Sequence, residues 1–178
     1  MKRLSIALAL LASAAVRAEN LIPFNAGFEL GSPAGWYMWI DEKSTGNASF
    51  QTTEKEPHTG SYALQFDVKR APKEPWQIVL TIPQWTAKPA TRYRLKFWAK
   101  GPGSIKVNSS DTDKNYAWMG GFSTDLSPTQ WTEVSGEIAT TTQSGKGKVS
   151  VGVGLGQTAG TYYLDDFSIE EITPTPSK

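Results

Sequence analysis

The 178-residue sequence contains no cysteine and only one histidine, His58. The chain therefore forms no disulfide bond and offers neither a thiolate zinc site nor a site built from several histidines. Packing or an oxygen-ligated metal ion is left to hold the fold together. No Ser-His-Asp arrangement is visible around His58, and no glycine-rich phosphate-binding loop occurs.

The sequence also lacks an apolar run long enough to span a bilayer. Its longest apolar stretch, Leu4 to Val16, follows two basic residues and precedes a small-residue cleavage site that ends at Ala18. This pattern predicts a secretory signal peptide over residues 1–18. We therefore expect a secreted or periplasmic protein without a membrane span.

Neither sign of charge is in large excess. The chain has 18 Lys and Arg against 17 Asp and Glu, and without the three basic residues of the predicted signal peptide 15 face 17, a net charge of −2. Proteins that bind nucleic acid present a basic face, so this balance argues against a nucleic-acid partner. The length suits one domain over residues 19–172, followed by a Pro- and Thr-rich tail at 173–178.

Apolar and polar residues alternate along most of the chain, turn residues separate the alternating segments, and no segment has a sustained helical period. This pattern predicts an all-β fold with two antiparallel sheets packed face to face, a β-sandwich of the jelly-roll type. The predicted inward positions are Tyr62, Leu64, Phe66 and Val68; Ile78, Leu80 and Ile82; Tyr93, Leu95 and Phe97; Ile105 and Val107; Val134 and Ile138; and Val149, Val151, Val153 and Leu155.

Two strand patterns contain unusual residues. Gly152, Gly154 and Gly156 alternate with inward valines, which indicates either close packing or a smooth floor beneath a ligand. Asp165 and Asp166 stand next to each other in the apolar segment 161–169, although Asp is disfavoured in strands and buried charge needs a compensating partner. We hypothesise that the partner is a metal ion, calcium, which ties the end of the chain to its beginning.

Six segments, in their order along the chain, resemble the family 4, 9 and 22 carbohydrate-binding modules. They are Asn20-Leu-Ile-Pro-Phe-Asn-Ala-Gly-Phe-Glu29, His58-Thr-Gly-Ser-Tyr-Ala-Leu-Gln-Phe66, Pro75-Trp-Gln-Ile-Val-Leu80, Tyr93-Arg-Leu-Lys-Phe-Trp-Ala-Lys100, Gln130-Trp-Thr-Glu-Val134 and Tyr162-Tyr-Leu-Asp-Asp-Phe-Ser-Ile169. The resemblance implies a galactose-binding-like sandwich that binds a plant or microbial polysaccharide or oligosaccharide without catalysing a reaction. It also implies that residues 20–29 form the first strand and that Trp98 and Trp131 are packing residues.

The resemblance further implies a structural calcium ion between the first and last strands. By position, Glu29, Asp165 and Asp166 would supply carboxylate oxygens, and the turn from Thr59 to Ser61 would add carbonyl oxygens. Calcium accepts such oxygen ligands. The alternative is that these carboxylates cap backbone amides or pair with Lys or Arg.

Sugar binding needs exposed aromatic faces for stacking and planar polar side chains for hydrogen bonds. Trp76, Trp39 and the i, i+2 pair Tyr116 and Trp118 are the aromatic candidates, with core packing as the alternative for each, and Trp85 is also expected to be exposed. The polar candidates are Gln77, Arg94, Asn115 and Gln65.

Two other functions stay open from the sequence. The aromatic face would also suit an interaction module of the envelope or secretion machinery that binds a protein partner. The chain has enough Asp and Glu for a small polysaccharide hydrolase or lyase, because glycosidases need two carboxylates across a cleft.

Overall fold

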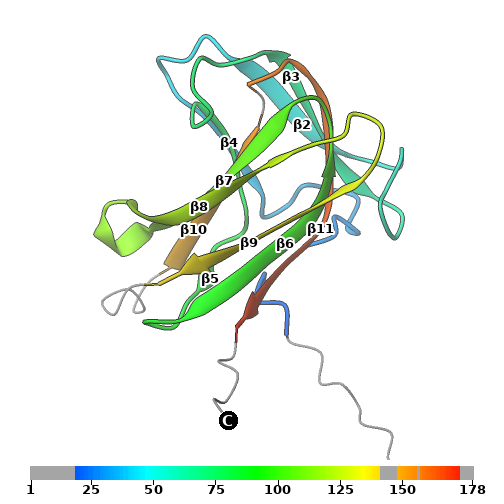
Figure 1. Cartoon of the computed structure of the whole chain (residues 1–178). Coiled ribbons are helices and arrows are strands. Elements are labelled where there is room, and N and C mark those ends of the chain that lie inside the picture. Colours follow the sequence, from blue (N-terminus) through cyan, green and yellow to red (C-terminus); the bar gives the residue numbers. More distant parts are fainter. Residues whose placement is uncertain (1–18, 141–147, 156, 173–178) are drawn as a thin grey trace, which may run out of the picture.

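The computed structural model describes residues 19–140, 148–155 and 157–172. In these residues two antiparallel sheets face each other (Figure 1), which confirms the predicted β-sandwich. The predicted signal peptide, the 173–178 tail and Gly156 lie outside the described residues. Within the described part of the chain, no helix is long and apolar enough to cross a membrane.

We name the two sheets A and B. Sheet A has the order β1 (Tyr37–Ile40), β4 (Ile78–Thr81), β10 (Lys148–Leu155), β7 (Ser104–Asp111) and β8 (Ala117–Asp125), and β5 (Trp85–Thr86) also pairs with β10. Sheet B has the order β2 (Asn47–Thr53), β3 (Ala63–Arg70), β11 (Gly160–Glu171), β6 (Arg92–Lys100) and β9 (Thr132–Ala139). A short 3-10 helix, η1 (Thr112–Lys114), connects β7 to β8.

The core lies between the sheets because every second residue of each strand points inward. All predicted inward residues are buried except Tyr62, which is partly buried and packs against the core. The ring centroids of Phe97 and Phe167 stack 4.3 Å apart, and Trp36 packs 4.6 Å from Phe167. Burying each of these rings contributes about 2–3 kcal/mol before the entropy cost of ordering.

The N-terminal segment 20–36 forms turns and contains no strand, so the first strand expected over residues 20–29 is absent. Positive φ angles at Asn25 (51°) and Phe28 (59°) are incompatible with an extended strand. The segment nevertheless joins the last strand, because the Leu21 amide donates a 2.8 Å hydrogen bond to the carbonyl of Ile169. The beginning and end of the described chain are thus tied by backbone hydrogen bonds.

Candidate functional site

The outer face of sheet A carries a groove with a volume of about 890 Å³. It crosses β1, β4, β10 and β7, because residues of all four strands line it. The lining residues are Gly35, Tyr37, Trp39, Trp76, Val79, Thr81, Ile82, Gln84, Asn108, Ser110, Tyr116, Ser150 and Gly152. None of these described lining residues carries a formal charge.

A row of paired residues crosses the floor of the groove. The strand register places Tyr37 opposite Thr81, Thr81 opposite Gly152, and Gly152 opposite Asn108, so these four residues form one row across the sheet. A Cβ atom on Gly152 would lie 2.5 Å from the side chain of Val79. Gly152 is therefore both tightly packed and part of the floor. The two interpretations of the glycine pattern, close packing and a smooth floor, thus both apply at this position.

Two tryptophans form an aromatic wall at the β1 side of the groove. The ring centroids of Trp39 and Trp76 lie 6.4 Å apart with an interplanar angle of 25°, and the side chains are 40% and 50% exposed. Tyr37 lies two residues before Trp39 on β1 and lines the same groove. Residues two apart on a strand share a face, so the edge strand holds both rings toward the ligand side.

Gln77 does not line the groove, although it was predicted to do so. The residue is buried, its Oε1 accepts hydrogen bonds of 3.1 Å from the amides of Lys73 and Glu74, and its Nε2 donates to Asp41 at 3.2 Å. Gln77 thus fixes the turn that presents Trp76, which makes it a positioning residue. Because Gln77 lies in this turn, just before β4 begins, its side chain does not follow the alternation of that strand.

The opposite end of the groove is formed by Tyr116, which immediately precedes β8. Tyr116 lines the groove and is 63% exposed, whereas Trp118 is 72% exposed and does not line it. The register pairs Trp118 with Ser110, which does line the groove, so Trp118 lies on the same outer face beside it. Asn115 is exposed and caps η1 in a left-handed conformation, outside the lining.

Arg94 and Gln65 lie on sheet B and are therefore on the other side of the sandwich from the groove. Arg94 pairs with Glu137 at 3.6 Å, and Gln65 donates a 2.8 Å hydrogen bond to Asp67. Periodicity predicted their outward orientation but not which sheet they belong to. Neither Arg94 nor Gln65 lines the groove.

Three other tryptophans pack against neighbouring aromatic rings and lie outside the groove. Trp85 was expected to be exposed, but it is buried against Tyr93 with 4.7 Å between ring centroids, so that expectation was wrong. Trp98 stacks on His58 at 4.2 Å, and Trp131 contacts the same imidazole ring edge-on at 5.4 Å. Both are half-buried on the sheet B side.

The sequence analysis did not single out the polar residues on the groove floor. Asn108 and Ser110 on β7 alternate with the buried residues Val107 and Ser109, and both line the groove. The alternation in the sequence could therefore have predicted that both side chains point outward. However, nothing in the sequence showed that the outer face of β7 lies beside Trp39 and Trp76.

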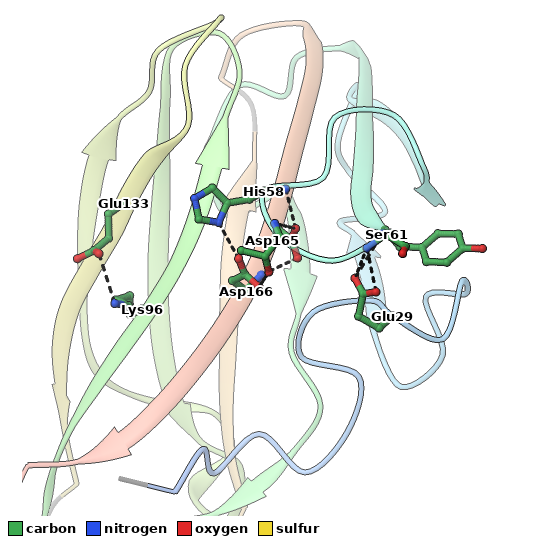
Figure 2. A network of polar contacts seen from close by, with 9 residues as sticks. Glu29, His58, Ser61, Lys96, Glu133, Asp165 and Asp166 are labelled. Carbon is green, nitrogen blue, oxygen red and sulfur yellow. Dashed lines mark hydrogen bonds and ion pairs between the residues drawn. The ribbon is translucent and has the colours of Figure 1, made fainter. Parts of the chain in front are cut away.

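The predicted calcium ligands form a second cluster, on the bulge of β11 (Figure 2). Asp165 pairs with Trp98 and Ser168 pairs with Lys96, so Asp166 and Phe167 are bulged out of the regular register. Asp166 has a φ angle of 52°, in the left-handed region. The bulge explains how two adjacent aspartates fit into an apolar strand.

Asp165 is fully buried and accepts three backbone hydrogen bonds. Its Oδ2 accepts from the amides of His58 (2.9 Å) and Thr59 (3.3 Å), and its Oδ1 accepts from the amide of Asp166 (2.7 Å). Burial, and then the charge of Asp166, raises the pKa of Asp165 to about 6, although the three backbone hydrogen bonds act in the opposite direction. Asp165 thus holds the 58–59 turn against β11.

Asp166 and Glu29 hold the same turn region from either side. Asp166 contacts the Nδ1 atom of His58 at 2.6 Å and accepts a 2.6 Å hydrogen bond from the hydroxyl of Thr59. The Glu29 carboxylate accepts backbone hydrogen bonds from Ser61 at 3.0 Å and from Tyr62 at 3.2 Å. In Figure 2, Glu29 reaches Ser61 while the two aspartates meet His58.

As arranged, this cluster does not fit a calcium ion. The turn presents N–H groups to Asp165 and Glu29, whereas calcium needs oxygen atoms converging on one point. In addition, no group of three or more His, Asp or Glu residues able to hold a metal was found among the described residues. The arrangement corresponds to the amide-capping alternative, and the calcium site stays an untested prediction.

Comparisons with known proteins identify the family. Residues 20–160 match the sequence model of the family described as carbohydrate binding domain, CBM_4_9, and the chain belongs to this family. None of the curated proteins searched matches the sequence.

Solved structures confirm the fold. A CBM4 module is 16% identical with a TM-score of 0.68 and covers 84% of this chain and 99% of its own. The CBM22-1 xylan-binding domain of Paenibacillus barcinonensis Xyn10C is 17% identical with a TM-score of 0.65, covering 91% and 100%. TmCBM61, solved in complex with β-1,4-galactotriose, is 22% identical with a TM-score of 0.58, covering 87% and 100%. Membership of the family supports a carbohydrate-binding role.

Proposed function

We propose that the protein is an exported, non-catalytic binding module that holds a neutral polysaccharide chain in the groove of sheet A. The observation that carries this proposal is a groove of about 890 Å³ with exposed aromatic rings at both ends and no charged lining residue. The C–H faces of sugar rings would stack on Trp39, Trp76 and Tyr116. The sugar hydroxyls would exchange hydrogen bonds with Asn108 and Ser110.

The length of the groove suits a chain rather than a single sugar. The order of sheet A has five strands from β1 to β8, and neighbouring strands lie about 4.8 Å apart, so the backbones of β1 and β8 are about 19 Å apart. A chain of several sugar rings would therefore contact both ends at once. A monosaccharide would contact only one end and bind more weakly.

A binding role without hydrolysis is supported by the lining. Glycoside hydrolysis requires two carboxyl groups on either side of the scissile bond. None of the described groove-lining residues is Asp or Glu, and the buried carboxylate of Asp165 lies in sheet B. Release of reducing ends from a bound polysaccharide would contradict this part of the proposal.

The test is a binding screen by affinity electrophoresis and calorimetry on soluble xylan, β-glucan, galactan and cello-oligosaccharides. We expect at least one polysaccharide to bind, and the double variant Trp39→Ala/Trp76→Ala to lower its affinity about 100-fold, because truncating each of two central aromatic contacts costs roughly 1–2 kcal/mol. Leu30→Ala is the matched control, because Leu30 is 57% exposed but lies outside the groove.

The screen also distinguishes sugar binding from the rival function, which is binding of a protein partner. If no polysaccharide binds the folded protein, the proposal fails and a protein partner on the same aromatic face becomes the better hypothesis. If the double variant binds as well as the wild type, the sugar site lies elsewhere.

A further inference from the structure

A second, smaller hollow lies beside the groove on the same face of sheet A. Its volume is about 80 Å³, and it is lined by Pro75, Ser104, Lys106, Ser123, Gly154 and Gln157. The register places Gly154 opposite Lys106, and Lys106 opposite Ser123, so three of these residues form one row across β10, β7 and β8.

This row adjoins the groove floor. Lys106 lies two residues before Asn108 on β7, and Gly154 lies two residues after Gly152 on β10, so each pair shares a face. Two residues of a strand span about 6.6 Å. Pro75 immediately precedes Trp76 of the aromatic wall. A group attached to a sugar in the groove would therefore reach the hollow without any displacement of the main chain.

The hollow and the groove differ in charge. The groove lining is uncharged, whereas the hollow combines the ammonium of Lys106 with the hydroxyls of Ser104 and Ser123 and the amide of Gln157. Lys106 is exposed and forms no ion pair with any residue that the structure describes.

The nearest acidic position in this register is that of Asp125. Asp125 is exposed and pairs with Ser104 in the register, one row beyond Lys106. It forms no ion pair with Lys106 and does not line the hollow. The hollow thus gathers hydrogen-bond donors around an uncompensated positive charge, which is the chemistry that recognises a carboxylate.

We propose that the hollow at Lys106 is a subsite for the carboxylate of a uronic acid substituent carried by a polysaccharide whose neutral backbone lies in the groove. The protein would then prefer a chain decorated with uronic acids to the same chain without them. This inference rests on the proposed sugar-binding function and deepens it by naming the substrate class.

The experiment compares glucuronoxylan with carboxyl-reduced glucuronoxylan, in which each carboxylate has become a CH₂OH group while the backbone is unchanged. Affinities are measured for the wild type, Lys106→Gln and Lys106→Arg. Lys69→Gln is the matched control, because Lys69 is exposed on β3 of sheet B and its replacement removes the same charge away from the groove. An undecorated β-glucan and a sulfated galactan complete the panel.

We expect the wild type, Lys106→Arg and Lys69→Gln to bind glucuronoxylan about three- to fivefold more tightly than the reduced polymer at low ionic strength. Lys106→Gln should bind both polymers equally. The preference should disappear at high salt, because an exposed ion pair is screened.

Three results would overturn the inference. Equal affinity of the wild type for both polymers would remove the subsite and leave the groove intact, as would binding of the undecorated β-glucan alone. A preference for the sulfated galactan would assign the hollow to sulfate instead. Failure to bind any polysaccharide would overturn the proposed function itself, so the two failures are distinguishable.

Discussion

The outer faces of the two sheets use their side chains in opposite ways. On sheet B, Arg92 and Arg94 pair with Glu137, and Lys96 pairs with Glu133, so several charges on this face are ion-paired with one another. On sheet A, the outward aromatic rings are 40% to 72% exposed, even though Trp39 and Trp76 stack on each other. Protein surfaces seldom leave several large aromatic side chains uncovered together unless they bind something. This contrast supports the proposal that the protein binds its ligand on sheet A, while sheet B provides structural support.

Among substitutions in sheet B, Asp165→Ala should have the largest effect on stability. This substitution leaves the amides of His58, Thr59 and Asp166 without their acceptor, and we expect a loss of about 3–5 kcal/mol in the free energy of unfolding. Chemical denaturation measures it. Glu137→Ala, which removes an exposed carboxylate of sheet B, is the control and should cost less than about 1 kcal/mol. Equal costs would show that the bulge does not hold the turn.

The raised pKa of Asp165 predicts that the free energy of unfolding depends on pH. The expected change is nearly as large as the loss expected for Asp165→Ala. The pKa is about 6 in the folded protein and about 3.9 in an unfolded chain, so the folded state binds the proton more tightly. The stability that Asp165 contributes is complete below about pH 4 and is lost as the pH rises through about 6, by at most about 3 kcal/mol. The difference in unfolding free energy between wild type and Asp165→Asn should fall across this window. A constant difference would contradict the shift.

Within sheet A, the two ends of the groove should differ in importance. Trp76→Ala should weaken polysaccharide binding about tenfold or more, because Trp76 lines the groove and stacks beside Trp39. Trp118→Ala should weaken binding about two- to threefold, because Trp118 lies beside the lining. Calorimetry on the best polysaccharide of the screen measures both. The reverse order would place the main sugar contacts at the start of β8.

Calcium should have little effect on unfolding if the turn is held by the observed hydrogen bonds. We expect the midpoints of thermal unfolding in excess calcium and in chelator to agree within about 1 °C. A clearly higher midpoint with calcium would show that Glu29 and Asp165 rearrange around the ion. It would then establish the calcium site that the sequence predicts.

The smallest effect should come from Arg94→Ala. Arg94 was a candidate sugar ligand from sequence, but it pairs with Glu137 on sheet B. We expect polysaccharide affinity to change by less than about twofold, because the side chain lies on the opposite sheet from the groove. A tenfold loss of affinity in the folded variant would show that sheet B also binds sugar.

The sequence by itself determined most of the strands, their buried faces and the resemblance to the family, but it did not predict β1 and β2 and it wrongly predicted a strand over residues 20–29. Alternation at every second residue places Leu64, Phe66 and Leu95 inward wherever the strands lie, because a strand can bury only one side against the core. The aromatic candidates Trp39, Trp76 and Tyr116 were also identifiable, because rings outside the buried set are available for a ligand.

Only the tertiary structure decided which outward residues meet. Trp39 and Asn108 share a groove because β4 and β10 lie between their strands, and strand order depends on contacts between distant segments rather than on local pattern. For the same reason the sequence did not show that Arg94 lies on the opposite sheet from the groove, or that Trp85 is buried. The groove is thus a property of strand order, while the sandwich that carries it follows from the alternation of residues.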